Sequence, residues 1–187
     1  MSEVSFTFFE TAVGRCGIAW GSRGAVSVLL PEKSEAASRA RLARRFPEAR
    51  EAVPPPEIQR AIDDIVALLA GGRRDLSDVP LDFESLPAFH RRVYEVARAI
   101  PPGSTISYGE IAARLGEPRA AREVGEALGK NPFLIVVPCH RVLAAGGKLG
   151  GFSARGGVAT KLRLLEIEGA LKPEAPMLFE DLPRAVR

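Results

Sequence analysis

Three short runs of β-prone apolar residues open the chain, at residues 4–9, 16–20 and 25–30. Glycines at positions 14, 17, 21 and 24 lie between or within these runs. Short apolar runs separated by glycine are typical of strands joined by tight turns. The pattern therefore predicts a small antiparallel meander.

Helical periodicity follows the meander. Ser34 is placed to cap a helix over about 35–45, because serine accepts hydrogen bonds from the free N–H groups of a first helical turn. In 57–70 apolar residues recur every three or four positions before a Gly-Gly pair ends the run, which predicts a second helix. Residues 73–86 show no periodicity and are expected to connect two parts of the chain.

The second part of the chain has a mainly helical pattern. An apolar stripe at Phe89, Val93, Val96 and Ile100 predicts a helix of about three turns. Two short helical segments then follow, SYGEIAARLG and AAREVGEALGKN, joined by a tight turn that carries Gly116. Ser107 and Glu110 in the first of them have the spacing of a capping box. This arrangement is typical of a helix-turn-helix.

Residues 133–137 (FLIVV) are expected to form a buried strand that runs into Pro-Cys-His-Arg-Val, followed by a glycine-rich loop over 146–157 and a last helix over about 158–168. The predicted fold class is α+β. A small N-terminal α/β domain with an antiparallel sheet, residues 1–85, precedes a mostly helical, winged-helix-like domain, residues 86–171. Residues 172–187, rich in proline, are expected to form a tail.

Composition narrows the functional classes. The chain of 187 residues is 46% hydrophobic and 26% charged, which excludes a disordered or collagen-like protein. No apolar run approaches the length of a membrane span, and no leader pattern is seen, so a cytoplasmic protein without membrane association is expected. The net charge is uneven: residues 1–86 hold 11 Lys/Arg and 13 Asp/Glu, and residues 87–187 hold 15 and 10. The second part is therefore the better candidate for contact with a polyanion.

Cys139 is the main candidate for chemistry. A thiol is a useful nucleophile only as thiolate, and His140 and Arg141 supply a base and a cation within two residues. In an extended segment His140 and Cys139 would point to opposite faces, so direct assistance needs a turn after Pro138 or a bridging water. A Cys-His pair alone is more often a buried, inert cysteine beside a structural histidine.

The longer sequence around Cys139 favours a reactive cysteine over an inert one. NPFLIVVPCHRVLAAGGKLGGFS, preceded by ISYGEIAARLGEPRAAREVG, resembles the O6-alkylguanine-DNA alkyltransferases, also called methylated-DNA–protein-cysteine methyltransferases. The resemblance covers about residues 86–171. It implies a DNA-repair protein, expected to be monomeric, that flips an alkylated guanine out of double-stranded DNA. It then transfers the alkyl group irreversibly to its own cysteine, without a cofactor.

The resemblance also implies roles for individual residues. The nucleophile is Cys139, with His140 as its base acting through a water and Glu168, rather than Glu166, orienting the imidazole. Asn131 bridges the helix-turn-helix to the active-site strand, and Tyr108 crowds the phosphate of the target and can donate a proton. Arg122 enters the base stack in place of the extruded nucleotide. The remaining implied positions are DNA contacts at Arg119, Ala121, Gly125 and Arg141, and pocket positions at Pro138, Val142, Phe152 and Ser153.

Three residues depart from the family pattern. Glu123 and Glu126 place two acids on the helix that carries Arg122 and are expected to weaken DNA binding unless they face away. Leu134 replaces a common proline and is expected to reshape the pocket wall. No metal site is expected, because Cys16 has no cysteine or histidine nearby in the first domain.

Three other functions compete with repair. A lesion sensor that binds alkylated DNA without repairing it is opposed by the presence of Cys139, since such proteins lack the nucleophile. A methyl-switched transcription regulator is opposed by a short, acidic N-terminal part without a cysteine cluster. A cysteine hydrolase would need a second histidine, and His90 is the other one in the chain.

Overall fold

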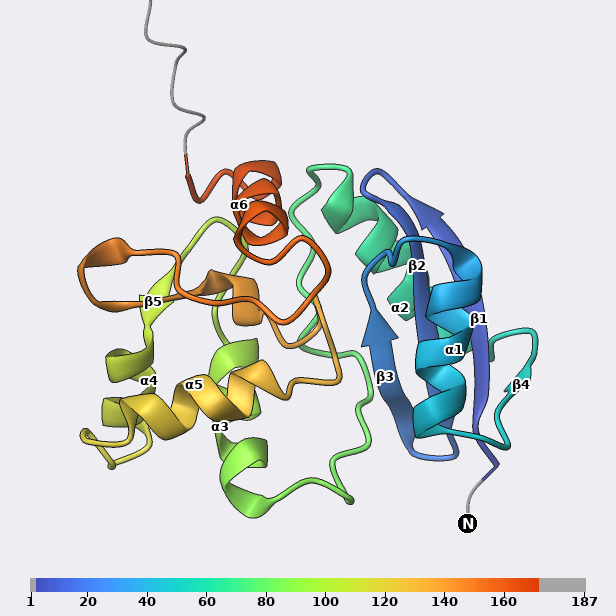
Figure 1. Cartoon of the computed structure of the whole chain (residues 1–187), viewed down its shortest axis with the longest axis horizontal. Helices are drawn as coiled ribbons and strands as arrows, with labels where there is room; N and C mark the ends of the chain where they lie inside the picture. The colour runs from blue at the N-terminus through green and yellow to red at the C-terminus, as the bar shows by residue number, and fades with distance from the viewer. Residues whose placement is uncertain (1–2, 172–187) are drawn as a thin grey trace, which may run out of the picture.

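The structure is a computed structural model that describes residues 3–171. A sheet flanked by helices forms the N-terminal half, and a helical half with long loops lies beside it (Figure 1). The tail expected at residues 172–187 lies outside the described residues. None of the described helices combines the length and the hydrophobicity that a membrane crossing needs.

The predicted meander is confirmed. Strands β1 (Ser5–Thr11), β2 (Gly14–Gly21) and β3 (Gly24–Leu29) pair antiparallel in that order. A fourth strand that the sequence analysis did not predict, β4 (Arg50–Glu51), adds in parallel to the outer edge of β1. At only two residues it is too short to show a period-2 pattern.

The two faces of this sheet bury different helices. Phe6, Ala19 and Leu29 pack with Leu42 of α1 (Glu35–Arg45) on one face. Alternate residues of the same strands, such as Ile18 and Val28, face α2 (Pro56–Leu69) and the main core. Both helices match their predictions, and Ser34 caps α1 by accepting from the backbone N–H of Ala37.

The C-terminal half begins with α3 (Ala88–Arg98), which carries the predicted apolar stripe except Ile100; Ile100 lies beyond the end of the helix and is buried in the core. Helices α4 (Tyr108–Arg114) and α5 (Ala121–Gly129) form the helix-turn-helix and pack against each other and against α3. The capping box of Ser107 and Glu110 is present. Helix α6 (Val158–Ile167) closes the described chain, as predicted.

The strand expected at residues 133–137 is absent. The segment is fully buried, as expected, but it forms isolated bridges around a turn. Ile135 has a φ of 74°, a left-handed conformation that no strand accommodates and that a β-branched residue rarely adopts. The backbone N–H of Val137 donates to the carbonyl of Phe133, so the turn satisfies its own polar groups.

The same segment joins the two halves. The backbone N–H of Val28 donates to the carbonyl of Pro132 at 2.8 Å, and that of Leu134 donates back to Val28. Ser27 Oγ also donates to Pro132. One hydrophobic core runs through both halves, from Ile18 and Val28 to Tyr94 and Phe133. The halves are therefore held in a fixed relation along β3.

Candidate active site

Cys139 lies where the buried turn ends. After Pro138 the chain enters a 3₁₀ turn, η1 (Cys139–Arg141), which supplies the bend that the sequence analysis required for His140 to assist Cys139. Cys139 is 5% exposed. Its backbone N–H donates to the carbonyl of Val137 at 2.8 Å, which fixes the start of the turn.

His140 and Glu168, which are expected to act together, are in direct contact. The Nε2 atom of His140 lies 2.9 Å from Oε1 of Glu168, with both side chains almost fully buried. The other ring nitrogen, Nδ1, is buried without a hydrogen-bond partner among the described residues. A neutral imidazole that donates from Nε2 to the carboxylate keeps Nδ1 as a free acceptor. Glu166 is exposed on another face of α6, so Glu168 is the acid that pairs with His140.

Arg141 does not face the surface, and its assignment as a DNA contact is wrong. Its side chain is 6% exposed, and its guanidinium donates to both carboxylate oxygens of Glu168 at 2.8 Å. It also donates to the carbonyl of Ile100. The 3₁₀ turn directs this side chain inward, where a buried carboxylate requires a cation or hydrogen-bond donors.

The protonation states follow from burial and pairing. Burial raises the pKa of the Cys139 thiol and lowers the pKa of His140. Burial also opposes ionisation of Glu168, but hydrogen bonds from Arg141 and His140 outweigh it and hold its pKa at about 2. The resting site is thus a thiol, a neutral imidazole and a carboxylate. This combination is suited to moving the thiol proton toward the imidazole when a substrate arrives.

Asn131 holds the segment around the sulfur. Its side-chain amide donates to the carbonyl of Val137 at 2.8 Å and lies 3.4 Å from Sγ of Cys139. Its Oδ1 accepts from the backbone N–H of Phe133. Asn131 directly follows α5 and Lys130, so it connects the helix-turn-helix to the buried turn, as expected from the resemblance.

A cavity of about 490 Å³ opens in front of Cys139. This volume lies within the range of small-molecule sites. Its lining combines predicted pocket residues with the predicted DNA-facing helix: Tyr108, Ala121, Arg122, Gly125, Cys139, Phe152 and Ser153 are among them. Pro138 and Val142, also expected there, are fully buried and absent from this lining.

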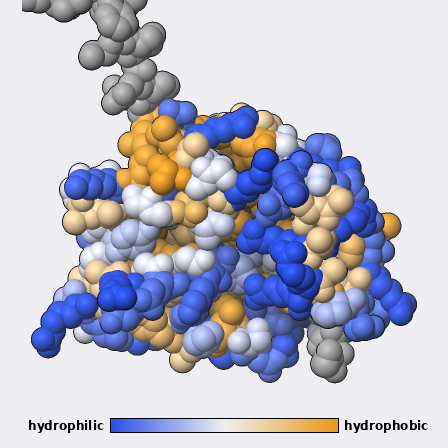
Figure 2. Space-filling model, viewed as in Figure 1, coloured by the Kyte–Doolittle hydropathy of each residue, from blue (hydrophilic) through white to orange (hydrophobic). Residues whose placement is uncertain are grey.

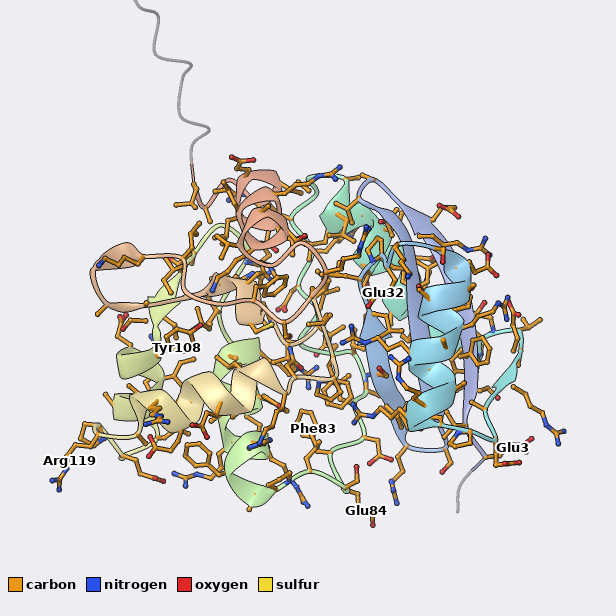
Figure 3. The ribbon with its side chains drawn as sticks, viewed as in Figure 1. Glu3, Glu32, Phe83, Glu84, Tyr108 and Arg119 are labelled. Atoms are coloured by element: carbon orange, nitrogen blue, oxygen red, sulfur yellow. The ribbon has the colours of Figure 1, made fainter. Side chains whose placement is uncertain are left out.

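Tyr108 is positioned through a two-stranded parallel pairing that was not predicted. Strand β5 (Ile106–Ser107) pairs with β6 (Val142–Leu143), the segment just after the catalytic turn. Tyr108, labelled in Figure 3, begins α4 directly after β5, so this pairing ties the start of α4 to the segment that follows Cys139. The side chain is half-buried, and burial raises its pKa, so its hydroxyl remains a proton donor at neutral pH.

Lys161 is a functional candidate that the sequence analysis missed. It is fully buried, and its Nζ donates to the carbonyl of Val142 at 2.6 Å and to that of Gly151 at 3.5 Å. Its ammonium also lies 5.9 Å from the ring centre of Tyr108. Burial lowers its pKa, whereas Cys139 raises it. The available signal was the spacing of seven residues between Lys161 on α6 and Glu168, the residue that caps α6, which places both on one helical face.

The predicted DNA-facing residues lie on an exposed surface of the helix-turn-helix. The side chain of Arg122 is 89% exposed and forms an ion pair with Glu126 at 3.4 Å. Glu123 is exposed as well, and it lines a separate surface hollow with Arg119. Arg119 extends away from the turn before α5 (Figure 3). Of the two acids, Glu126 is the one that is paired with the arginine.

Leu134 and His90 are both absent from the residues that line the cavity of Cys139. Leu134 lines a neighbouring cavity at the junction of the halves and is not among the residues that line the cavity of Cys139, so its effect on that pocket wall stays a prediction. His90 packs near Tyr94, with ring centres 6.0 Å apart, and does not line the cavity of Cys139. This placement gives no support to a cysteine hydrolase. Within residues 3–171, histidine, cysteine and acidic residues form no group of three able to hold a metal.

Comparisons with known proteins agree with this geometry. Residues 88–170 match the family model for the 6-O-methylguanine DNA methyltransferase, DNA binding domain. A methylated-DNA–protein-cysteine methyltransferase of Methanothermobacter thermautotrophicus is 39% identical over 154 residues, 82% of this chain and 78% of that protein. A Thermus thermophilus protein named DNA base-flipping protein is 44% identical over 128 residues, 68% and 81% of the two chains.

Solved structures give the same result. The crystal structure of Mycobacterium tuberculosis OGT in complex with DNA matches with a TM-score of 0.71 and 34% identity, covering 89% of this chain and 93% of that chain. The resemblance inferred from the Pro-Cys-His-Arg segment is thus confirmed over both halves of the molecule. The chain belongs to the methylated-DNA–protein-cysteine methyltransferase family.

Proposed function

We propose that this protein repairs DNA by transferring an alkyl group from O6 of guanine to Sγ of Cys139. The observation that carries the proposal is the placement of Cys139 at a cavity large enough to admit a nucleobase, beside the buried His140–Glu168 pair. In this reaction the bond between O6 and the alkyl carbon breaks and an S–C bond forms. The thiol proton passes to His140, and a proton ends on the released purine. The step balances without a cofactor and leaves a thioether, so each molecule acts once.

The cavity residues have distinct tasks in this reaction. Phe152 and Ser153 border the extruded base, and Asn131 holds the segment that aligns Sγ with the alkyl carbon. Alignment of this kind supplies much of the rate of a displacement reaction. Tyr108 donates toward the purine and crowds the phosphate of the target nucleotide. A donor near the leaving oxygen stabilises the charge that develops there.

Base extrusion explains the exposed face of α5. An alkyl group on O6 prevents normal pairing with cytosine, so the damaged base costs less to flip than an intact one. Arg122 is exposed at the mouth of the cavity and can fill the gap in the stack while neutralising phosphate charge. Ala121 and Gly125 leave space for the duplex beside it.

The finer architecture belongs to the same proposal. We infer a winged-helix-like docking in which α5 enters a groove of the duplex and the loop after β6 flanks it. The protein acts as a monomer on double-stranded DNA in the cytoplasm, without membrane association. The division at residues 85 and 86 separates a supporting N-terminal domain from the DNA-binding one.

The decisive experiment is an intact-mass measurement after incubation with duplex DNA that carries O6-methylguanine. The expected result is a gain of one methyl group, located on Cys139 by peptide mapping. Cys139→Ser should abolish the gain while lesion binding remains. Cys16→Ser is the matched control, because Cys16 is buried in the sheet and contacts Thr11 rather than the cavity.

A lesion sensor that binds alkylated DNA without repairing it is the second candidate function, because one relative carries the name DNA base-flipping protein. An unmodified protein that still binds the lesion with preference over undamaged DNA would support the sensor and contradict repair. Alkylation of the wild type at Cys139 would exclude it.

A further inference from the structure

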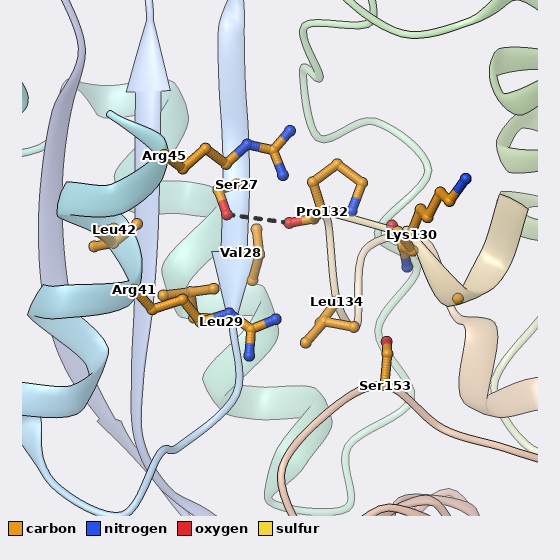
Figure 4. Close-up of a pocket in the computed structure, with 12 residues that line it drawn as sticks. Ser27, Val28, Leu29, Arg41, Leu42, Arg45, Lys130, Pro132, Leu134 and Ser153 are labelled. Atoms are coloured by element: carbon orange, nitrogen blue, oxygen red, sulfur yellow. Dashed lines mark hydrogen bonds between the residues drawn. The ribbon is translucent and has the colours of Figure 1, made fainter. Parts of the chain in front are cut away.

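A second cavity lies beside that of Cys139, at the junction of the two halves. It has a volume of about 150 Å³, and Gly129 and Ser153 line both cavities. Its walls come from α1, from β3 and from the segment after α5 (Figure 4). It is therefore contiguous with the cavity that an extruded nucleotide would enter.

Three cationic residues are among those that line this cavity, and no acidic residue is. Arg41 and Arg45 lie one helical turn apart on α1, and Lys130 directly follows α5. Figure 4 shows both arginines extending from α1 toward the segment that carries Pro132 and Leu134. Ser27 and Ser153 add hydroxyl groups to the lining.

Two of these cations lack a counterion. Arg41 is paired with Glu32 at 2.7 Å. Neither Arg45 nor Lys130 forms an ion pair with a carboxylate among residues 3–171. Burial and the neighbouring Arg41 both lower the pKa of Arg45. An anion at this position would relieve the repulsion between the two arginines.

The junction holds these cations in a fixed relation to α5. The hydrogen bonds of Val28 and Ser27 to Pro132 join β3 to the residue two positions after Lys130. Hydrophilic side chains also gather over the region between α5 and α1 (Figure 2). A duplex that contacts α5 through Arg122 and runs past the C-terminal end of that helix would meet Lys130 first and Arg45 next.

We propose that Arg45 and Lys130, supported by Arg41, bind a backbone phosphate of the DNA next to the extruded nucleotide. The N-terminal half then contributes directly to DNA binding, although its overall charge is negative. The ligand is a phosphodiester, because cations beside hydroxyl donors suit a single oxyanion. A contact of this kind positions the DNA and does not read its base sequence. This inference rests on the proposed function for the position of the duplex.

The test measures affinity for duplex DNA carrying O6-methylguanine as a function of salt. Arg45→Ala should weaken binding about tenfold at low salt and reduce the slope of log affinity against log salt by about one. Arg44→Ala is the matched control, because it removes the same charge from the same helix at an exposed position that does not line the cavity. Equal salt slopes for the two variants would overturn the inference.

A second measurement identifies the phosphate. Single neutral methylphosphonates are placed in turn along the strand near the lesion. One position should weaken binding of the wild type and of Arg44→Ala but not of Arg45→Ala. If no position distinguishes the variants, the inference fails. It also fails if inorganic phosphate raises the melting temperature of the wild type but not of Arg45→Ala, while the two proteins have the same salt slope for DNA binding. The site then holds a free anion.

The outcome can be separated from that of the proposed function. Alkylation of Cys139 by free O6-alkylguanine needs no DNA phosphate and should proceed equally in the wild type and in Arg45→Ala. If the wild type and Arg45→Ala are both alkylated and bind DNA with identical affinities, the phosphate site alone is overturned. Absence of alkylation in the wild type, with DNA affinity that depends on Arg45, overturns the repair function and supports the phosphate site.

Discussion

Glu168 is shared between His140 and Arg141: its Oε1 lies 2.9 Å from Nε2 of His140 and 2.8 Å from the guanidinium of Arg141. One buried carboxylate thus orients the proposed base and neutralises a buried cation. Removing its charge acts on both partners. Chemistry and stability are therefore coupled at this residue, and experiments on it must measure them separately.

Glu168→Gln should slow alkyl transfer to Cys139 by roughly a hundredfold, because an amide cannot stabilise the imidazolium that forms as the thiol loses its proton. The variant should also lose about 3 to 5 kcal/mol of unfolding free energy, because the guanidinium of Arg141 stays buried without its counterion. Single-turnover kinetics with free O6-alkylguanine measure the first effect, and denaturant unfolding measures the second.

Glu166→Gln is the control for this variant, since Glu166 lies two residues earlier on α6 and is exposed. It should leave rate and stability unchanged. A Glu168→Gln protein that is destabilised but transfers the alkyl group at the wild-type rate would show that the carboxylate has a structural role alone.

Acid should destabilise the protein through the same residue. The pKa of Glu168 is about 2 in the folded state against an ordinary value of 4.5, so its contribution is full above pH 4.5 and is lost as the pH falls toward 2. The folded-state pKa of His140 is also lowered, which adds a loss as the pH falls below 6.5. Unfolding free energies measured between pH 7 and 3 should therefore decrease. The decrease should be smaller in Glu168→Gln, and identical pH profiles would contradict the assignment.

The sequence predicted most helices and the meander because each carries a strong local signal. Ser34 and the Ser107–Glu110 box mark helix starts by hydrogen bonds that involve neighbouring residues alone. The turn at residues 133–137 carries no such signal. Its apolar, β-branched composition follows from burial on all sides, and burial does not distinguish a strand from a buried turn. The turn that contains Ile135, with its φ of 74°, is flanked by Pro132 and Leu134, which bond to Val28 of β3, distant in sequence.

The candidate site likewise contains residues that the sequence predicted and residues that it did not. Cys139, His140 and Glu168 were predicted from the family resemblance, and the structure brings His140 and Glu168 into contact. Arg141 was misplaced because nothing in the sequence shows that a 3₁₀ turn directs it inward. Lys161 was missed because a lysine in an amphipathic helix normally faces solvent, whereas this one is buried against the carbonyl of Val142.

Lys161→Met should shift the pH dependence of alkyl transfer. Burial raises the pKa of Cys139 above its ordinary value of 9.0, and the charge of Lys161 partly offsets that rise. The wild-type rate with free O6-alkylguanine should therefore increase with pH through neutrality, and in Lys161→Met the rise should begin at higher pH. A rate–pH profile between pH 6 and 10 measures the shift.

Two controls separate this electrostatic effect from a packing effect. Lys148→Met removes the same charge from an exposed loop position and should leave the profile unchanged. Circular dichroism and unfolding curves of Lys161→Met show whether the core is intact. A lower rate at every pH without a shift of the profile would mean that Lys161 shapes the loop through Gly151 and does not tune the thiol.

Glu126→Gln should strengthen binding to duplex DNA about two- to fivefold, because it releases Arg122 from its ion pair and removes a negative charge close to phosphates. Arg122→Ala should weaken repair in duplex DNA much more than reaction with free O6-alkylguanine, since the free base needs no extrusion. Glu57→Gln, at an exposed position of α2, is the charge-matched control for Glu126→Gln. In the double variant that combines Glu126→Gln with Arg122→Ala, the gain in DNA affinity from Glu126→Gln should be smaller, because the arginine that it would release is absent. An undiminished gain would show that Glu126 acts through general repulsion of DNA. If Arg122→Ala slows the reaction with duplex DNA and the reaction with the free base equally, the proposed role of Arg122 in extrusion is contradicted.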